Sequence, residues 1–159
     1  MAQEIERKFL VDPSKLPKLS SCYTIKQGYI AASGATVRVR IRDNEAFLTL
    51  KGKAEGLTRS EFEYSIPVTD AEAMLSELCI HPFISKKRYF VEHEGHTWEL
   101  DIFEGENEGL IVAEIELESE TEPFAKPDWV TEEVSHDPRY RNACRVSHPF
   151  SAWKAEERL

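Results

Sequence analysis

The sequence predicts a mainly β protein (α+β) in which eight antiparallel strands close into a barrel, with a charged lumen and a few helices outside it. Charged and apolar residues alternate with a period of two through most of the 159 residues, as they do in strands whose two faces meet different surroundings. Turn residues separate these segments, and a single internal segment shows a convincing helical stripe. We expect one domain over residues 1–159, since no linker, repeat or low-complexity tract divides the chain.

The composition excludes several classes of protein. The net charge of −9 argues against a nucleic-acid partner, because such binding normally needs a basic surface. No apolar run reaches the roughly 20 residues of a membrane-spanning helix, and the N-terminus is too polar for a secretory signal. The three cysteines form no CxxC pair, which suits a reducing compartment. We therefore expect a cytoplasmic protein with no membrane partner, either a monomer or a homodimer.

The expected strands follow from the alternation and from the turns between them. Asp43-Asn44 and Glu94-Gly95 are turn signals that join neighbouring segments as hairpins. A proline-punctuated turn covers residues 12–21. The strands are expected at residues 4–10, 22–31, 36–42, 45–52, 60–68, 83–93, 96–105 and 110–119.

Residues 69–78 form the clearest helix. Thr69 can cap its N-terminus, and Glu72 three residues later would complete a capping box. Ala71 and Leu75 belong to its apolar stripe. A second helix is expected around residues 139–146, after a less regular, proline-bounded tail.

The charged residues of the strands form short ladders on one face. Side chains two apart on a strand share a face, and in most strands the charged residues occupy one parity and the apolar residues the other. The charged positions are Glu4, Glu6, Lys8, Arg38, Arg40, Lys51, Arg59, Glu61, Glu63, Lys86, Arg88, Asp101, Glu114 and Glu116. The simpler interpretation places these faces in water. However, a solvent face normally mixes polar residues, whereas most of these ladders carry one sign and need the opposite sign on a neighbouring strand.

The sharper interpretation turns the charged faces toward the inside of the barrel. A dry interior of this kind is untenable, because each unpaired buried ion costs on the order of several kcal/mol. The interior must therefore hold water, a ligand or both. Carboxylates suit hard divalent cations, while Arg and Lys suit a polyanion. A metal-complexed polyphosphate would satisfy both kinds of ladder.

The ordered motifs resemble those of the CYTH superfamily, also called triphosphate tunnel metalloenzymes. The segment EIERKFL is similar to the family's ExExK signature, and it is followed in order by RxR, LTLKG, RxExEY, KxRY, ELDIFEG and AEIELE segments. The resemblance is nearest to the short bacterial inorganic triphosphatases and covers residues 4 to about 142. Tyr140 and Asn142 resemble a C-terminal YxN element, although Arg141 stands where relatives often carry a small residue.

The resemblance implies a closed tunnel that hydrolyses inorganic triphosphate to pyrophosphate and phosphate by in-line attack of a metal-activated water. It implies Mg²⁺ or Mn²⁺ as cofactor, with two ions per site. The residues expected at the chemistry are Glu4, Glu6, Lys8 and Arg40. Those expected to bind the phosphates are Lys8, Arg38, Arg40, Lys51, Arg59, Lys86 and Arg88. The expected metal ligands are Glu4, Glu6, Glu61, Glu63, Asp101, Glu114 and Glu116, any of which could instead pair with a basic neighbour.

Other activities are possible on the same scaffold, because a fold does not determine a function. The alternatives are a class IV adenylyl cyclase, a thiamine or nucleoside triphosphatase, and a non-catalytic polyphosphate or nucleotide binder. The expected tunnel positions provide no aromatic platform for a base or a thiazole, and the chain has no added domain. Both observations favour inorganic triphosphate as the substrate.

Overall fold

The computed structural model describes residues 2–20, 22–81 and 83–140, and its strands form one antiparallel sheet. Every strand predicted from the alternation is present, with ends that differ from the expected ones by a few residues. The strands are β1 (Ala2–Val11), β2 (Cys22–Ile30), β3 (Thr36–Arg42), β4 (Glu45–Lys51), β5 (Thr58–Ile66), β6 (Ile84–His93), β7 (His96–Glu104), β8 (Ile111–Glu116) and β9 (Val130–Glu133).

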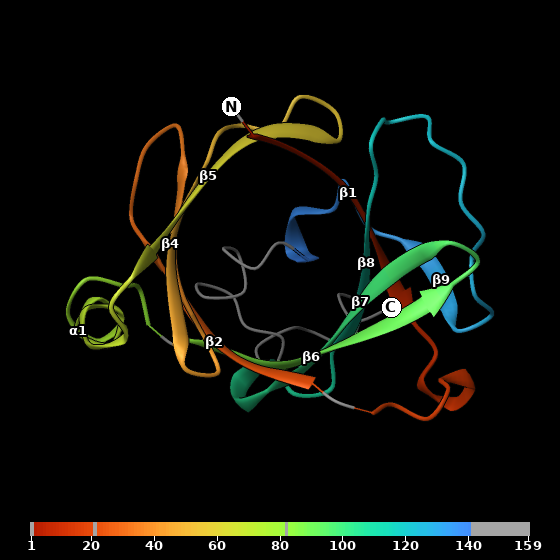
Figure 1. Cartoon of the computed structure of the whole chain (residues 1–159), viewed down its shortest axis with the longest axis horizontal. Coiled ribbons are helices and arrows are strands. Elements are labelled where there is room, and N and C mark those ends of the chain that lie inside the picture. The colour runs from red at the N-terminus through yellow and green to blue at the C-terminus, as the bar shows by residue number, and fades with distance from the viewer. Residues whose placement is uncertain (1, 21, 82, 141–159) are drawn as a thin grey trace.

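Eight of these strands close into a barrel. The order around it is β5-β4-β3-β2-β6-β7-β8-β1, and a further pairing of β5 with β1 completes the ring. Figure 1 looks down this ring, with α1 (Val68–Glu77) and β9 on its outer side. The predicted eight-stranded barrel is therefore confirmed. The ninth strand, β9, pairs with β1 near Phe9 and Val11 and was not predicted, because its four residues show no usable alternation.

The strand register turns the charged parities toward the same side of the sheet. Residues directly opposite each other on neighbouring strands share a face, and charged positions repeatedly fall opposite one another. Lys8 is opposite Glu114, and Arg88 is opposite Asp101. The pairing that closes the barrel places a carboxylate and a guanidinium together in the same way. The ladders of separate strands thus become one continuous charged inner wall.

The apolar parities pack outside the barrel. On one side Trp98, which is fully buried, packs against Phe9 and Trp129; its ring centre lies 5.6 Å from that of Phe9 and 5.9 Å from that of Trp129. On the other side α1 places Ala71 and Leu75 against the outer faces of β3 and β4. The barrel is held from outside by apolar contacts, which leaves its inner face available for charge.

The inner parities become apolar toward one end of the barrel. Ile84 precedes Lys86 and Arg88 on the inner face of β6, and Phe103 and Val112 lie on the inner faces of β7 and β8. These side chains pack with Tyr29 and Tyr140 in a single buried cluster. The apolar cluster therefore lines this part of the lumen and limits the charged region along the axis.

The α1 helix begins one residue earlier than predicted, and the predicted capping box is absent. Pro67 occupies the N-cap position without a side-chain cap, and its carbonyl oxygen accepts a hydrogen bond from the Ala71 amide. Thr69 consequently lies inside the helix, because the chain turns directly from the end of β5 into α1. Within the described residues no helix has the length and apolar character that crossing a membrane requires.

The remaining helical segments are short 3₁₀ turns at Pro13–Lys15, Gly105–Asn107 and Pro138–Tyr140. The predicted second helix falls mostly outside the described residues, which end at residue 140.

We expect Gly28→Ala to destabilise the protein. Gly28 lies where β2 passes under α1, and an added Cβ would lie 3.0 Å from the Cβ of Cys79 and 3.0 Å from Cδ2 of Leu75. Such overpacking typically costs about 1–3 kcal/mol, measurable as a loss of unfolding free energy in urea. Gly52→Ala is the matched control, because its nearest neighbouring atom is 3.7 Å away. Unchanged stability in Gly28→Ala would show that α1 is free to shift outward.

Candidate active site

The barrel encloses a cavity of about 690 Å³ whose wall is predominantly charged. All the predicted site residues line it except Lys86 and Asp101, which are buried. The predicted residues on the wall are Glu4, Glu6, Lys8, Arg38, Arg40, Lys51, Arg59, Glu61, Glu63, Arg88, Glu114 and Glu116. The structure therefore brings together side chains that are up to about a hundred positions apart in the sequence.

The acidic side of the cavity is formed by the neighbouring strands β5, β1 and β8. Glu6 is its most constrained member: burial and the nearby carboxylates of Glu114 and Glu4 raise the pKa of Glu6 well above its usual value. Burial would raise the pKa of Glu114 as well, but Lys8 and Arg88 outweigh it and lower that pKa to about 2. Glu6 thus carries an electrostatic cost that a bound cation would relieve.

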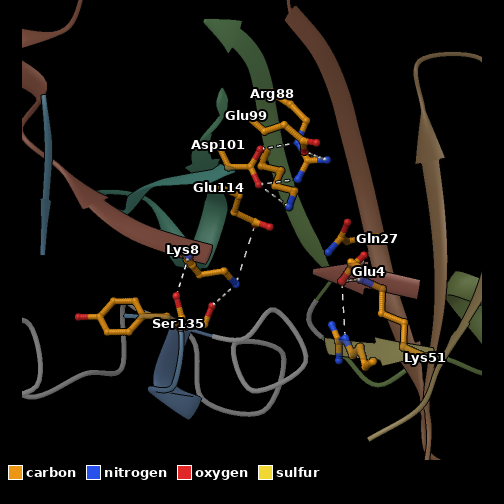
Figure 2. A network of polar contacts seen from close by, with 12 residues as sticks. Glu4, Lys8, Gln27, Lys51, Arg88, Glu99, Asp101, Glu114 and Ser135 are labelled. Atoms are coloured by element: carbon orange, nitrogen blue, oxygen red, sulfur yellow. Dashed lines mark hydrogen bonds and ion pairs between the residues drawn. The ribbon is translucent and has the colours of Figure 1, made fainter. Parts of the chain in front are cut away.

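Two basic residues neutralise the part of this acidic wall near Glu4. The Lys51 ammonium donates hydrogen bonds to both carboxylate oxygens of Glu4, at 3.0 and 2.9 Å, and lies 3.5 Å from Glu61. Arg59 approaches Glu4 from the next strand at 3.6 Å. Figure 2 shows Lys51 and Glu4 within this network.

Asp101 and Lys86 form a buried ion pair with Arg88 at its edge. Lys86 donates to Asp101 at 2.8 Å, and Arg88 donates two hydrogen bonds to the same carboxylate, at 2.7 and 2.9 Å. Arg88 also contacts Glu99 at 2.7 Å, as Figure 2 shows. Both oxygens of Asp101 are engaged by cations, so Asp101 acts as the support that holds Arg88 in the cavity wall.

Arg38 and Arg40 project from β3 on the side of the cavity opposite β1. Arg38 donates to the hydroxyl of Thr49 at 3.2 Å and approaches Glu63 at 3.5 Å. Arg40 donates through Nε to the side-chain oxygen of Gln27 at 2.7 Å. Burial, with Arg38 and Arg88 close by, lowers the pKa of Arg40 to about 9. Both guanidinium groups line the cavity and carry the planar N–H donors that suit an anion.

Lys8 joins the barrel to the segment after β9. Its ammonium donates to the backbone oxygen of Tyr140 at 2.9 Å and lies 3.9 Å from Glu114, while its backbone amide donates to the hydroxyl of Ser135 at 2.9 Å. The Tyr140 ring is buried in the apolar cluster at the end of the lumen. Asn142, the other residue of the expected YxN element, lies outside the described residues.

Several wall residues were not predicted as site residues, among them Tyr29, Lys53, Glu99, Ser135 and His136. Glu99 shares its parity with Asp101, so the alternation contained the signal for it. Ser135 and His136 lie after β9, in a segment with no periodic pattern. Tyr29 is an aromatic residue on the wall, but it is only 7% exposed and packs in the apolar cluster, so it offers no open face for a base.

The fold and the cavity define a closed antiparallel barrel with a charged tunnel. The sequence matches the CYTH domain family over residues 2–142, and the chain belongs to that family.

Full-length relatives support the same assignment. The chain is 46% identical to an inorganic triphosphatase of Acetivibrio thermocellus, covering 97% of this chain and 99% of the relative. It is 38% identical to an inorganic triphosphatase of Nitrosomonas europaea, covering 87% and 93% respectively. The crystal structure of the inorganic triphosphatase NE1496 superposes with a TM-score of 0.65 at 34% identity, covering 89% of this chain and 96% of that one.

We expect Asp101→Asn to destabilise the fold. Removing one partner of a buried ion pair typically costs about 3–5 kcal/mol, because Lys86 and Arg88 would lose the carboxylate that compensates for their burial. Urea unfolding at neutral pH measures the loss. Glu104→Gln is the control: Glu104 lies 3.9 Å from Lys87 in an exposed pair, which contributes little.

The pH dependence of this difference has a defined sign. Burial alone would raise the pKa of Asp101, but Arg88 and Lys86 hold it well below the ordinary value of 3.8. The ionised carboxylate therefore contributes stability above about pH 4 that is lost as the pH falls toward its native pKa. The gap in unfolding free energy between wild type and Asp101→Asn should shrink below pH 4. A gap that is constant from pH 7 to pH 3 would contradict this assignment.

Proposed function

We propose that this protein hydrolyses inorganic triphosphate to pyrophosphate and phosphate with Mg²⁺ or Mn²⁺ as cofactor. The observation that supports this most strongly is the enclosed cavity, in which carboxylates of β1, β5 and β8 face guanidinium groups of β3 and β6. The near full-length similarity to proteins named inorganic triphosphatase supports the same reaction.

The acidic wall fits divalent cations that bind together with the substrate. Its oxygen donors are those that Mg²⁺ and Mn²⁺ prefer, and burial, together with the nearby carboxylates of Glu114 and Glu4, raises the pKa of Glu6. Among the described residues no three acidic, His or Cys side chains are grouped to hold an ion by themselves. Phosphate oxygens and water would therefore complete the coordination, as is usual for Mg²⁺.

The proposed metal ligands are those predicted carboxylates that lie on the cavity wall, with two ions per site. They are Glu4, Glu6, Glu61, Glu63, Glu114 and Glu116. Asp101 is the least suited of the predicted ligands, because Lys86 and Arg88 already occupy its oxygens. When bound, the ions would neutralise phosphate charge and increase the acidity of the attacking water.

The basic residues would bind the phosphate chain and stabilise the charge that develops during its cleavage. Arg38, Arg40 and Arg88 can each present planar N–H donors to phosphoryl oxygens, while Lys8 and Lys51 act as point charges near the carboxylates. Because these groups are positioned before the substrate arrives, they need little reorganisation as charge spreads over the transferring phosphoryl group.

The reaction consists of a single displacement at a terminal phosphorus. The water oxygen forms a bond to phosphorus, the bond from that phosphorus to the bridging oxygen breaks, and pyrophosphate leaves with the electron pair. The water proton is released to solvent or to a product oxygen. This scheme needs no covalent intermediate on the protein.

The alternative substrates are nucleoside and thiamine triphosphates, and the alternative reaction is cyclisation of ATP. The packing of Tyr29 in the apolar cluster favours a substrate without a ring to stack. A cytoplasmic location, and a monomeric or homodimeric state, remain predictions from composition.

We expect purified protein to release phosphate from inorganic triphosphate with Mg²⁺ or Mn²⁺, and to lose this activity in excess chelator. A phosphate-release panel should also include pyrophosphate, ATP and thiamine triphosphate, with cyclic AMP measured in parallel. Faster turnover of ATP, or cyclic AMP as the main product, would replace the proposed reaction by an alternative. Tight binding of triphosphate without turnover would indicate a non-catalytic binder.

We expect Glu6→Ala and Arg40→Ala to abolish turnover without unfolding the protein. Each removes a charge that the site needs in the transition state, where loss of one stabilising group typically lowers kcat about 100- to 1000-fold. Steady-state kinetics would measure the loss, and circular dichroism would verify folding. Glu72→Ala, on an exposed position of α1, is the control and should retain full activity. Full activity in either tunnel variant would refute the assignment of these side chains.

A further inference from the structure

The basic residue Arg40 differs from the other predicted phosphate-binding residues in its partner. Lys8, Arg38, Lys51, Arg59, Lys86 and Arg88 each lie within 4 Å of a carboxylate oxygen. Among the described residues, Arg40 forms no such ion pair. Its hydrogen bond is to an uncharged side chain, the amide of Gln27, at 2.7 Å.

Gln27 is itself held in a fixed orientation. It is fully buried on β2, directly opposite Arg40 in the β2–β3 register, and it is labelled at the tunnel wall in Figure 2. Its amide nitrogen donates to the hydroxyl of Tyr29 at 3.1 Å. Because a guanidinium can only donate, the amide oxygen of Gln27 faces Arg40, and the hydrogen bond from the amide nitrogen to Tyr29 holds the amide in that orientation.

This arrangement uses one edge of the Arg40 guanidinium and leaves the other available. Gln27 accepts the Nε–H, whereas the two terminal amino groups make no hydrogen bond with another described residue. Arg40 also lines the cavity directly. A neutral acceptor thus orients the guanidinium without cancelling its charge. A carboxylate at the same place would form a charge-assisted pair and compete with the substrate.

We propose that Gln27 is a positioning residue that orients Arg40 toward the phosphate chain while keeping its positive charge uncompensated, with the Tyr29 hydroxyl holding the amide nitrogen of Gln27 in place. This inference rests on the proposed function, because it assigns a role within that site. It also distinguishes the role of Arg40 from that of Arg88. Arg88 is neutralised by Asp101 and Glu99 and is suited to support, whereas Arg40 offers the excess charge that an anion would meet.

The test compares Gln27→Glu with Gln27→Ala. Glu has nearly the shape of Gln but adds the competing charge, so we expect kcat/KM for inorganic triphosphate to fall about 100-fold or more. Ala removes the orienting contact but leaves the charge of Arg40, so we expect a smaller fall, about 10-fold. Calorimetric titration with inorganic triphosphate and Mg²⁺ should show weaker binding in the same order. Lys26→Gln, the adjacent exposed position on β2, is the matched control and should behave as wild type.

The relative loss of kcat/KM in the two variants distinguishes a positioning role of Gln27 from a role in packing alone. If Gln27 only filled space, Ala would be the more damaging change and Glu would be nearly neutral. That order, or unchanged kinetics in Gln27→Glu, would overturn the inference while leaving the proposed function intact. Failure of wild-type protein to hydrolyse triphosphate would instead overturn the proposed function.

Tyr29→Phe provides a second variant if Gln27→Glu does not fold. It preserves the packed ring and removes the hydroxyl that orients the amide, so we expect kcat/KM to fall by about 3- to 10-fold. NMR detection of the Arg40 Nε–H gives a readout independent of activity. Its signal should be protected from solvent exchange in wild type and lose protection in Gln27→Ala, and equal protection in both would contradict the proposed hydrogen bond.

Discussion

The structure depends on one electrostatic constraint: charges enclosed by a barrel must be paired or hydrated, because desolvating an isolated ion costs several kcal/mol. The strand register meets this constraint by placing ions of opposite sign on neighbouring strands. Lys8 faces Glu114 and Glu4 faces Arg59 across adjacent strands. A shift of one residue in any strand would send its charged ladder outward and its apolar residues inward. The polar interior and the apolar outer layers therefore specify the same register.

The apolar cluster at one end of the lumen divides the charged residues into two groups. Where Ile84 and Phe103 replace the charged ladder, water is excluded, and the Lys86 ammonium lies 5.3 Å from the centre of the Phe103 ring. An ion in such surroundings can persist only with a close partner, which Asp101 supplies. Farther from this cluster the side chains line an open cavity, where pairing is looser and ligands can replace water. The position of a charged side chain along the barrel axis thus separates those that pair in the buried end from those that line the cavity.

The sequence predicts the barrel well because parity is a local property. Alternation shows which residues of a strand share a face, and the inward assignment of Glu6 or Arg40 follows once several ladders must be satisfied together. The partners of each ion depend on register and on distance from the apolar cluster, which are not local. Asp101 and Glu99 illustrate the difference: they share a parity and look equivalent in sequence, yet Asp101 is buried between two cations and Glu99 lines the cavity. Ser135 lies after an unpredicted strand, beyond any periodic signal.

The charge balance of the cavity supports the proposal that cations and a polyphosphate bind there together. The described wall carries as many carboxylates as lysine and arginine side chains, so it is close to neutral as a whole while strongly polar in its parts. A bare triphosphate would bring several negative charges beside Glu6, whose pKa is already raised by burial and by repulsion from Glu114 and Glu4. Divalent cations alone would leave the guanidinium side unsatisfied. A complex of triphosphate with divalent cations adds little net charge and supplies each side of the wall with ions of the opposite sign, which is the condition that an enclosed site requires.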